Sequence, residues 1–328
     1  MNRIEWANAT TVAEAVAEMA GGAVLKAGGV DLADLMKEGL IEPRRLVNIR
    51  RVRGLDRVVE DERGLHLGPL LTLAALADDP VVRRRCRALA EAAGHAATPQ
   101  IRNMATLGGN LLQRPRCWYF RSEAFHCKRK GGEHCFAIFG ENQYHAVFGN
   151  GVCAIVHPSA TATALVAHGA ALTLTGPAGA REVPLESIFV RPEADVTREH
   201  TLAPAEMITE VRVPALAAGA ASAYTKLGEK ESYDWPIAEV ACVLERSGGR
   251  VTRASVVLGA AAPVPWRARE AEAALTGQPL GEASARAAAK AALVDATPLS
   301  GNAYKLQVIE AVVRRTLLAA MNEAEVGR

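Results

Sequence analysis

The stretch Val24-Leu25-Lys26-Ala27-Gly28-Gly29-Val30-Asp31-Leu32 places a pair of glycines between a short apolar strand and the start of a helix. Glycine has no Cβ, so the backbone here can approach a ligand closely, and its N–H groups can receive a pyrophosphate. The pattern is not G-x-G-x-x-G, which argues against a Rossmann dinucleotide site. Taken alone, the pair is more typical of a tight structural turn than of a binding site.

A second glycine pair follows roughly 80 residues later, in Ala105-Thr106-Leu107-Gly108-Gly109-Asn110-Leu111. A hydroxyl and an amide stand beside these glycines, and such groups suit hydrogen bonds to phosphate, to ribityl hydroxyls or to a flavin edge. Two such loops, each following an α/β unit, favour one shared nucleotide site over two unrelated turns.

Around the two loops, hydrophobic periodicity predicts an α/β chain. Helices are expected at 11–19, 32–39, 71–77 and 83–93, and strands at 23–25, 46–49 and 65–68. The stretch 98–111 has loop character, residues 114–152 show no sustained periodicity, and regular structure is expected to resume at 154–156. A loop this long inside a compact domain is usually functional.

The alanine- and glycine-rich join at 215–221 is a candidate domain boundary. Beyond it, strands are expected at 239–245 and 250–258 around the turn Ser247-Gly248-Gly249, and helices at 266–275, 283–294 and 304–321.

Four of the six cysteines fall within 37 residues, with the spacing C-x9-C-x7-C-x17-C: Cys117, Cys127, Cys135 and Cys153. In a cytosolic protein such a cluster favours a metal site over disulfides. Zinc sites usually have a C-x-x-C knuckle, which is absent here, whereas long loops can wrap an iron–sulfur cube. From the spacing alone, an iron–sulfur cluster and structural zinc are about equally favoured. Two disulfides in an exported chain, or free thiols, stay open.

Elsewhere the sequence offers little that resembles a substrate-transforming site. It has no G-x-S-x-G elbow, no H-E-x-x-H motif and no Walker loop, so no catalytic residue is predicted. Cys86 and Cys242 are expected to be small buried side chains. Histidines in or beside the cysteine loop are expected at the surface or in hydrogen bonds, and four carboxylates are expected to form a solvated or interfacial patch: Glu229, Glu231, Asp234 and Glu239.

The length and charge of the chain restrict its class. A chain of 328 residues suggests two or three domains, and a net charge of +2 gives no argument for nucleic acid as a partner. No apolar stretch approaches the roughly 18–20 residues needed to span a bilayer, and the N-terminus lacks the apolar core of a signal peptide. The cytoplasm is therefore the default compartment, although a partner subunit with an export signal could carry the chain to the periplasm.

Taken in order, these motifs resemble the FAD subunit of the xanthine dehydrogenase/aldehyde oxidase family of molybdenum hydroxylases. The resemblance covers essentially the whole chain. Within the family, the cysteine loop is similar to an insertion that carries a 4Fe–4S cluster in periplasmic aldehyde oxidoreductases and 4-hydroxybenzoyl-CoA reductases, which favours iron–sulfur over zinc. Besides the two glycine loops, the resemblance is carried by residues 67–73, 99–103 and 206–208, Val213-Pro214, Lys226-x3-Lys230-x3-Asp234, Leu258-Gly259 and 265–267.

The resemblance implies an α+β fold. A two-part FAD-binding domain of the vanillyl-alcohol-oxidase (PCMH) type is expected over 1–215, with the iron–sulfur loop inserted at about 114–153. A C-terminal α+β domain of the CO dehydrogenase flavoprotein type is expected over 218–328.

The resemblance also implies an electron-transfer role in the oxidation of an aldehyde, an aromatic compound or a heterocycle. Electrons from a molybdopterin-binding large subunit would pass through 2Fe–2S centres of a small subunit to FAD in this chain, and then to an external acceptor. The three subunits would form a heterotrimer, which could itself dimerise.

Site residues follow from the same resemblance. The backbone of Val24–Leu32 would wrap the FAD pyrophosphate, and Ile208 and Lys226 would lie near the isoalloxazine ring. Cys117, Cys127, Cys135 and Cys153 would ligate the cluster. The remaining cofactor contacts would come from Thr72, Thr106, Gly108, Gly109 and Asn110.

Three positions depart from the family pattern. Val30 replaces the usual Thr, Ala160 replaces the Asp that commonly follows the Pro-Ser pair, and Lys230 replaces an Arg. The first two remove polar contacts to FAD, and they support an alternative in which the chain is a structural or assembly subunit with degraded FAD binding. A stand-alone FAD oxidase is a third option, which the absence of an acid/base constellation disfavours.

Overall fold

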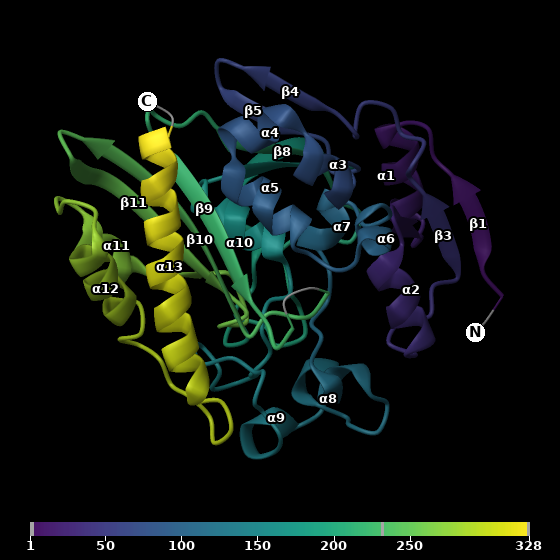
Figure 1. The fold of residues 1–328 in the computed structure, drawn as a ribbon. Coiled ribbons are helices and arrows are strands. Elements are labelled where there is room, and N and C mark those ends of the chain that lie inside the picture. The colour runs from purple at the N-terminus through teal and green to yellow at the C-terminus, as the bar shows by residue number, and fades with distance from the viewer. Residues whose placement is uncertain (1–2, 231–232, 327–328) are drawn as a thin grey trace.

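Three β-sheets organise the chain, and the computed structural model describes residues 3–230 and 233–326 of it (Figure 1). The first sheet is parallel, with strand order β1-β3-β2, because a helix follows each of its first two strands and returns the chain in the same direction. Its elements are β1 (Glu5–Asn8), α1 (Val12–Ala20), β2 (Val24–Lys26), α2 (Val30–Lys37) and β3 (Arg45–Asn48).

The second sheet is antiparallel, with strand order β4-β5-β8-β6-β7, and helices pack against it above the centre of the molecule (Figure 1). Leucines and alanines from both layers form its core. The strands are β4 (Val58–Asp61), β5 (Gly64–Leu67), β6 (Ala171–Gly176), β7 (Gly179–Pro184) and β8 (Met207–Pro214), and the helices are α3 (Leu73–Asp78), α4 (Pro80–Arg85), α5 (Arg87–Gly94), α6 (Pro99–Arg102), α7 (Leu107–Leu111), α10 (Ala160–Ala167) and η2 (Leu185–Ile188).

The third sheet is antiparallel, with strand order β12-β11-β10-β9, and the long helix α13 lies across it (Figure 1). The predicted turn is confirmed, because Gly248 and Gly249 join β10 to β11 with φ of 58° and 78°, values that favour glycine. Its elements are β9 (Ala221–Leu227), β10 (Ala238–Ser247), β11 (Arg250–Gly259), β12 (Trp266–Arg267), α11 (Arg269–Leu275), α12 (Glu282–Ala291) and α13 (Tyr304–Val326).

The helical turns of the cysteine segment lie at the lower edge of the view in Figure 1, whereas Val147 and Phe148 near its end pack into the core of the third sheet. As expected, the segment is irregular, with only three short helical turns: α8 (Trp118–Arg121), η1 (Lys128–Lys130) and α9 (Phe136–Phe139). The rings of Tyr119, Phe125 and Phe136 pack on one another and give it a small core of its own.

Four expectations for the local structure are wrong. The helix expected over 266–275 begins only at Arg269, because Trp266–Arg267 pairs with β11 as the strand β12. The helix expected over 83–93 is two helices, because Cys86 leaves helical geometry (φ −141°, ψ 57°); its N–H closes α4 on Val82, and its carbonyl starts α5. Residues 98–111 contain α6 and α7, each begun by a threonine cap. Regular structure does not resume at 154–156 but at α10, and the Ala154 carbonyl accepts a hydrogen bond from the Ala146 N–H of the cysteine loop.

No helix in the described part of the chain combines the length and the apolar character needed to cross a membrane.

His168 at the end of α10 gives the fold a predicted acid sensitivity. Burial, followed by the nearby Arg253, lowers its pKa from 6.5 to about 4, so the folded state keeps the ring neutral where the unfolded state is protonated. The stability that depends on the neutral ring is complete above pH 6.5 and is lost as the pH falls toward 4. Between pH 8 and pH 5, the free energy of unfolding of the wild type should fall by about 2 kcal/mol more than that of His168→Leu. Denaturant unfolding at both pH values measures this, and parallel losses in the two proteins would contradict it.

Candidate functional site

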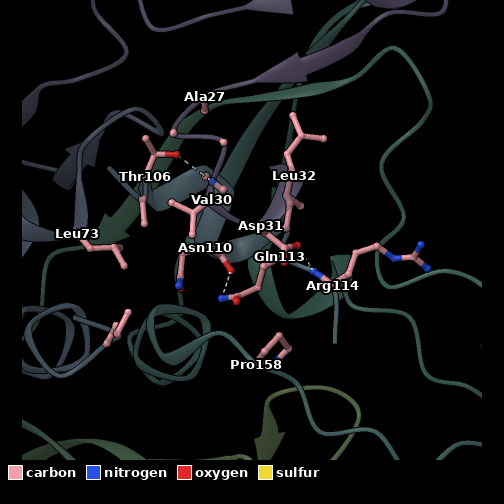
Figure 2. Close-up of a pocket in the computed structure, with 18 of the residues that line it drawn as sticks. Ala27, Val30, Asp31, Leu32, Leu73, Thr106, Asn110, Gln113, Arg114 and Pro158 are labelled. Carbon is pink, nitrogen blue, oxygen red and sulfur yellow. Dashed lines mark hydrogen bonds between the residues drawn. The ribbon is translucent and has the colours of Figure 1, made fainter. Parts of the chain in front are cut away.

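A cavity of about 650 Å³ lies where the three sheets approach one another, and each sheet contributes residues to its wall. Figure 2 shows part of this wall. The first glycine loop and α2 form one wall, and the second glycine loop with α7 forms another. The start of α10 and the strands β8, β9 and β10 complete it. This volume is ample for a cofactor of nucleotide size.

The first glycine loop is fixed by its two glycines in different ways. Gly29 adopts φ 81° and is the N-cap of α2, so this helix begins at Val30, two residues before the predicted start. At Gly28 a Cβ atom would lie 1.9 Å from the carbonyl oxygen of Met104. The two glycine loops, far apart in sequence, are therefore in backbone contact.

The second glycine loop is held by side chains beside it. Thr106 caps α7 by accepting a hydrogen bond from the Gly109 N–H at 3.3 Å. The Asn110 Oδ1 accepts hydrogen bonds from Ser159 at 2.7 Å and from Thr161 at 2.6 Å. These bonds fix the orientation of the Asn110 amide, whose nitrogen can donate to a group in the cavity (Figure 2).

Most of the residues expected at the cofactor lie on this cavity, and two do not. Lys26 instead lies over the ring of Trp6, with its Nζ 5.8 Å from the ring centroid. Thr72 caps α3 through the Ala75 N–H and pairs with Thr106, which places it behind the second loop. The residues on the cavity are Val24, Leu25, Ala27, Gly28, Gly29, Val30, Asp31, Leu32, Thr106, Gly108, Gly109, Asn110, Ile208 and Lys226.

One end of the cavity carries a lysine and a carboxylic acid on neighbouring strands. Lys226 on β9 and Glu239 on β10 are directly paired in the sheet, and both line the cavity. Burial lowers the pKa of Lys226, whose Nζ donates hydrogen bonds to the carbonyls of His95 and Asp234. Burial raises the pKa of Glu239.

Glu239 is a further residue whose place differs from the expectation. The expected solvated patch does not include it, because its side chain is only 2% exposed and accepts hydrogen bonds from Tyr224 at 2.5 Å and from Thr163 at 3.0 Å. Thr163 is 76 residues away in sequence, so no local pattern could reveal this pairing. Glu229 is exposed and hydrogen-bonds to Tyr144, and Glu231 lies outside the described residues.

Two of the three departures from the family pattern are on the cavity wall. Val30 begins α2, and Ala160 begins α10 directly after the capping Ser159. Both present only carbon atoms where a hydroxyl or a carboxylate was expected. Lys230 is exposed and does not line the cavity.

The four clustered cysteines line one small cavity of their own, which they share with Arg129. None of the six cysteines forms a disulfide in this structure. Cys135 and Cys153 hydrogen-bond to each other, which lowers the pKa of Cys135 to about 6 and raises that of Cys153. Burial raises the pKa of Cys117 to about 11, and its Sγ lies 3.2 Å from His145 Nε2.

The present arrangement of the thiols is closed. The cavity accessible to water is only about 10 Å³, and within the described residues no group of three or more His, Cys, Asp or Glu side chains has the geometry to hold a metal ion. An iron–sulfur cluster would therefore require the hydrogen-bonded Cys135 and Cys153 side chains to rotate apart. The donor set itself, four thiols beside a buried guanidinium, suits such a cluster.

Two family models match the sequence in succession. The FAD-binding domain of molybdopterin dehydrogenases matches residues 2–216, and the CO dehydrogenase flavoprotein C-terminal domain matches residues 222–320. This chain belongs to the FAD-binding subunits of the xanthine dehydrogenase/CO dehydrogenase family. The match confirms the resemblance inferred from the motifs, and with it the expected α+β fold class and the oxidoreductase class.

Individual relatives match this chain along nearly its whole length. The aldehyde oxidoreductase FAD-binding subunit PaoB of Escherichia coli (strain K12) is 34% identical, over 99% of each chain. The carbon monoxide dehydrogenase medium chain of Hydrogenophaga pseudoflava is 31% identical, over 97% of each chain. A solved structure of that dehydrogenase, lacking the Mo-pyranopterin moiety, matches 98% of each chain with a TM-score of 0.77.

Proposed function

We propose that this chain is the FAD-carrying electron-transfer subunit of a molybdenum-dependent hydroxylase that oxidises an aldehyde, an aromatic compound or a heterocycle. The observation that carries the proposal is the cavity between the two touching glycine loops. FAD bound there would accept electrons one at a time from iron–sulfur centres and release them in pairs.

The residues of the cavity fit this cofactor. The backbone of Val24–Leu32 can receive the pyrophosphate, since Gly28 and Gly29 line the cavity and carry no Cβ that would hold the cofactor away from the backbone. Thr106, Gly109 and Asn110 would hold the cofactor from the second loop. Ile208 and Lys226 would flank the ring system at the end where Glu239 is buried.

We further propose that Cys117, Cys127, Cys135 and Cys153 ligate a 4Fe–4S cluster. Their convergence on one cavity supports this, because the chain brings together thiols separated by up to 36 positions in an otherwise irregular loop. The positive charge of Arg129 would stabilise a thiolate-ligated cluster, which is anionic. Structural zinc is the competing occupant.

The proposed partners are a molybdopterin-binding large subunit, a small subunit with 2Fe–2S centres and an external electron acceptor. Their support is that this chain matches a carbon monoxide dehydrogenase medium chain along nearly its full length. We also propose a division into domains at 1–215 and 218–328, since β8 ends at Pro214 and β9 begins at Ala221.

A second candidate is a structural or assembly subunit that no longer holds FAD. The specific observation in its favour is that Val30 and Ala160 leave two apolar positions on the cavity wall. In that case the chain would still organise the complex and its cysteine loop.

Anaerobic mixing of substrate with the complete complex, compared with the isolated chain, tests the proposal. We expect an oxidisable substrate, such as an aldehyde, to bleach the flavin absorption of the complex and to leave that of the isolated chain unchanged. A complex that is active but contains no flavin would establish the assembly role. Bleaching of the isolated chain would reveal a substrate site of its own and would contradict the electron-transfer role.

A further inference from the structure

The cysteine loop forms part of the wall of the flavin cavity. Arg114 and Arg116, at the beginning of this loop, both line the cavity. The backbone N–H of Arg114 donates to Asp31 of the first glycine loop at 2.9 Å (Figure 2). Arg116 and the nearly buried Arg121 each reach the other oxygen of Asp31 at 2.8 Å. One carboxylate at the start of α2 therefore holds three groups from the cysteine loop.

A second carboxylate joins the flavin cavity to the cysteine cavity itself. Glu199 lines the flavin cavity and accepts hydrogen bonds from Arg114 at 3.0 Å and from Arg129 at 2.8 Å. The Arg129 side chain is only 1% exposed, and it also lines the cavity of the four cysteines. A single ion pair, Arg129–Glu199, thus contacts both sites.

A second feature of Arg129 makes it sensitive to negative charge in the cysteine cavity. Its Nη1 bonds Glu199 and, at 3.4 Å, the carbonyl of Arg198, but its buried Nε has no hydrogen-bond partner among the described residues. A buried guanidinium with an unsatisfied donor is costly, and nearby negative charge offsets that cost. The charged and titratable groups near Arg129 include Glu199, Cys153 and His157. Lys128 and the other three clustered cysteines line the same small cavity.

We infer that Arg129 and Glu199 are positioning residues that couple the two cofactor sites, so that a filled cysteine site increases the affinity for FAD. An anionic cluster would hold Arg129, Arg129 would hold Glu199, and Glu199 with Arg114 would fix the wall of the flavin cavity. This inference rests on the proposed cluster. Because such coupling is reciprocal, bound FAD also stabilises the cluster in its loop.

The FAD dissociation constant of the full-length chain, after removal of its flavin, tests the coupling. It is measured by flavin fluorescence for cluster-loaded protein and for protein depleted of iron with a chelator. We expect the loaded wild type to bind FAD about tenfold more tightly or better, within the usual 5- to 150-fold range of coupling between sites. Equal affinities in the two forms would overturn the inference.

Variants show whether the coupling passes through Arg129. We expect Arg129→Met to bind FAD weakly whether loaded or depleted, and Arg129→Lys to recover part of the difference, which a purely structural role would not produce. Glu199→Gln removes the same ion pair through its acidic partner, and it replaces Arg129→Met in this test if Arg129→Met does not fold. Arg212→Met is the matched control, because Arg212 forms a 2.5 Å ion pair with Glu182 away from both cavities. A coupling that persists in both Arg129→Met and Glu199→Gln would overturn the inference.

Iron analysis separates this inference from the cluster proposal. Protein that binds no iron under any condition refutes the cluster. A wild type that binds iron but has the same FAD affinity loaded and depleted leaves the cluster proposal standing and refutes the coupling alone. In iron-depleted protein, Arg129→Met and the wild type should bind FAD alike, because the coupling acts only through a filled cysteine site; a variant that binds much more weakly there would show a structural role for Arg129 in place of the coupling.

Discussion

Gly28→Ala is expected to lose FAD while the rest of the chain stays folded. The added Cβ would lie 1.9 Å from the Met104 carbonyl oxygen, so the two glycine loops would have to separate by about 1 Å. Backbone groups that hold a ligand tolerate such a displacement poorly. We expect the FAD dissociation constant to rise at least about 100-fold, equivalent to about 2.7 kcal/mol. The flavin-to-protein ratio after purification, together with titration of the protein freed of flavin, measures the effect.

Gly281→Ala is the matched control for this variant. Within the described part of the chain its added Cβ would have no heavy atom within 4 Å, and Gly281 does not line the cavity, so this variant should bind FAD as the wild type does. Circular dichroism of both variants separates a local loss of binding from unfolding. Normal FAD affinity in Gly28→Ala would mean that the contact between the two loops does not shape the flavin site.

Serine at Cys127 or Cys153 is expected to remove the metal from the cysteine loop. A hydroxyl is a far poorer ligand for iron than a thiolate, and a 4Fe–4S cluster needs one protein ligand on each of its four irons. We expect the iron content to fall from about four atoms per chain to less than about one. Iron and acid-labile sulfide assays on anaerobically prepared protein measure this.

Cys86→Ser and Cys242→Ser are the controls, since both cysteines are as deeply buried as the cluster candidates but lie in other cores. They should retain full iron content, although the buried hydroxyls will lower stability. Iron loss from the control variants as well would mean that the assay reports unfolding. Zinc bound by the wild type, and lost only from the loop variants, would replace the iron–sulfur assignment with a structural zinc site.

The parts of the fold that were predictable are those set by local pattern. The Ser247-Gly248-Gly249 turn needed glycine, and Thr11, with Glu14 three residues on, has the pattern of a helix cap and does cap α1. The break between α4 and α5 was not predictable, because apolar and basic residues keep helical spacing across Cys86. There the backbone changes direction without a proline or a glycine to signal it.

The candidate site also has features that the sequence predicts and features that it does not. The glycine pairs and the four cysteines are visible in the sequence because special backbone or ligand chemistry requires those residue types. The contact of Gly28 with Met104, the burial of Glu239 and the Arg129–Glu199 pair depend on how distant segments pack. An arginine 70 positions from its carboxylate partner leaves no local signature.

The visible absorption spectrum of the anaerobically purified chain, with flavin and iron assayed on the same sample, tests the central claim most directly. We predict flavin bands over a broad iron–sulfur shoulder, with one FAD and about four irons per chain. A chain that carries no flavin, and binds none when FAD is added, would contradict the claim that this cavity is a working flavin site.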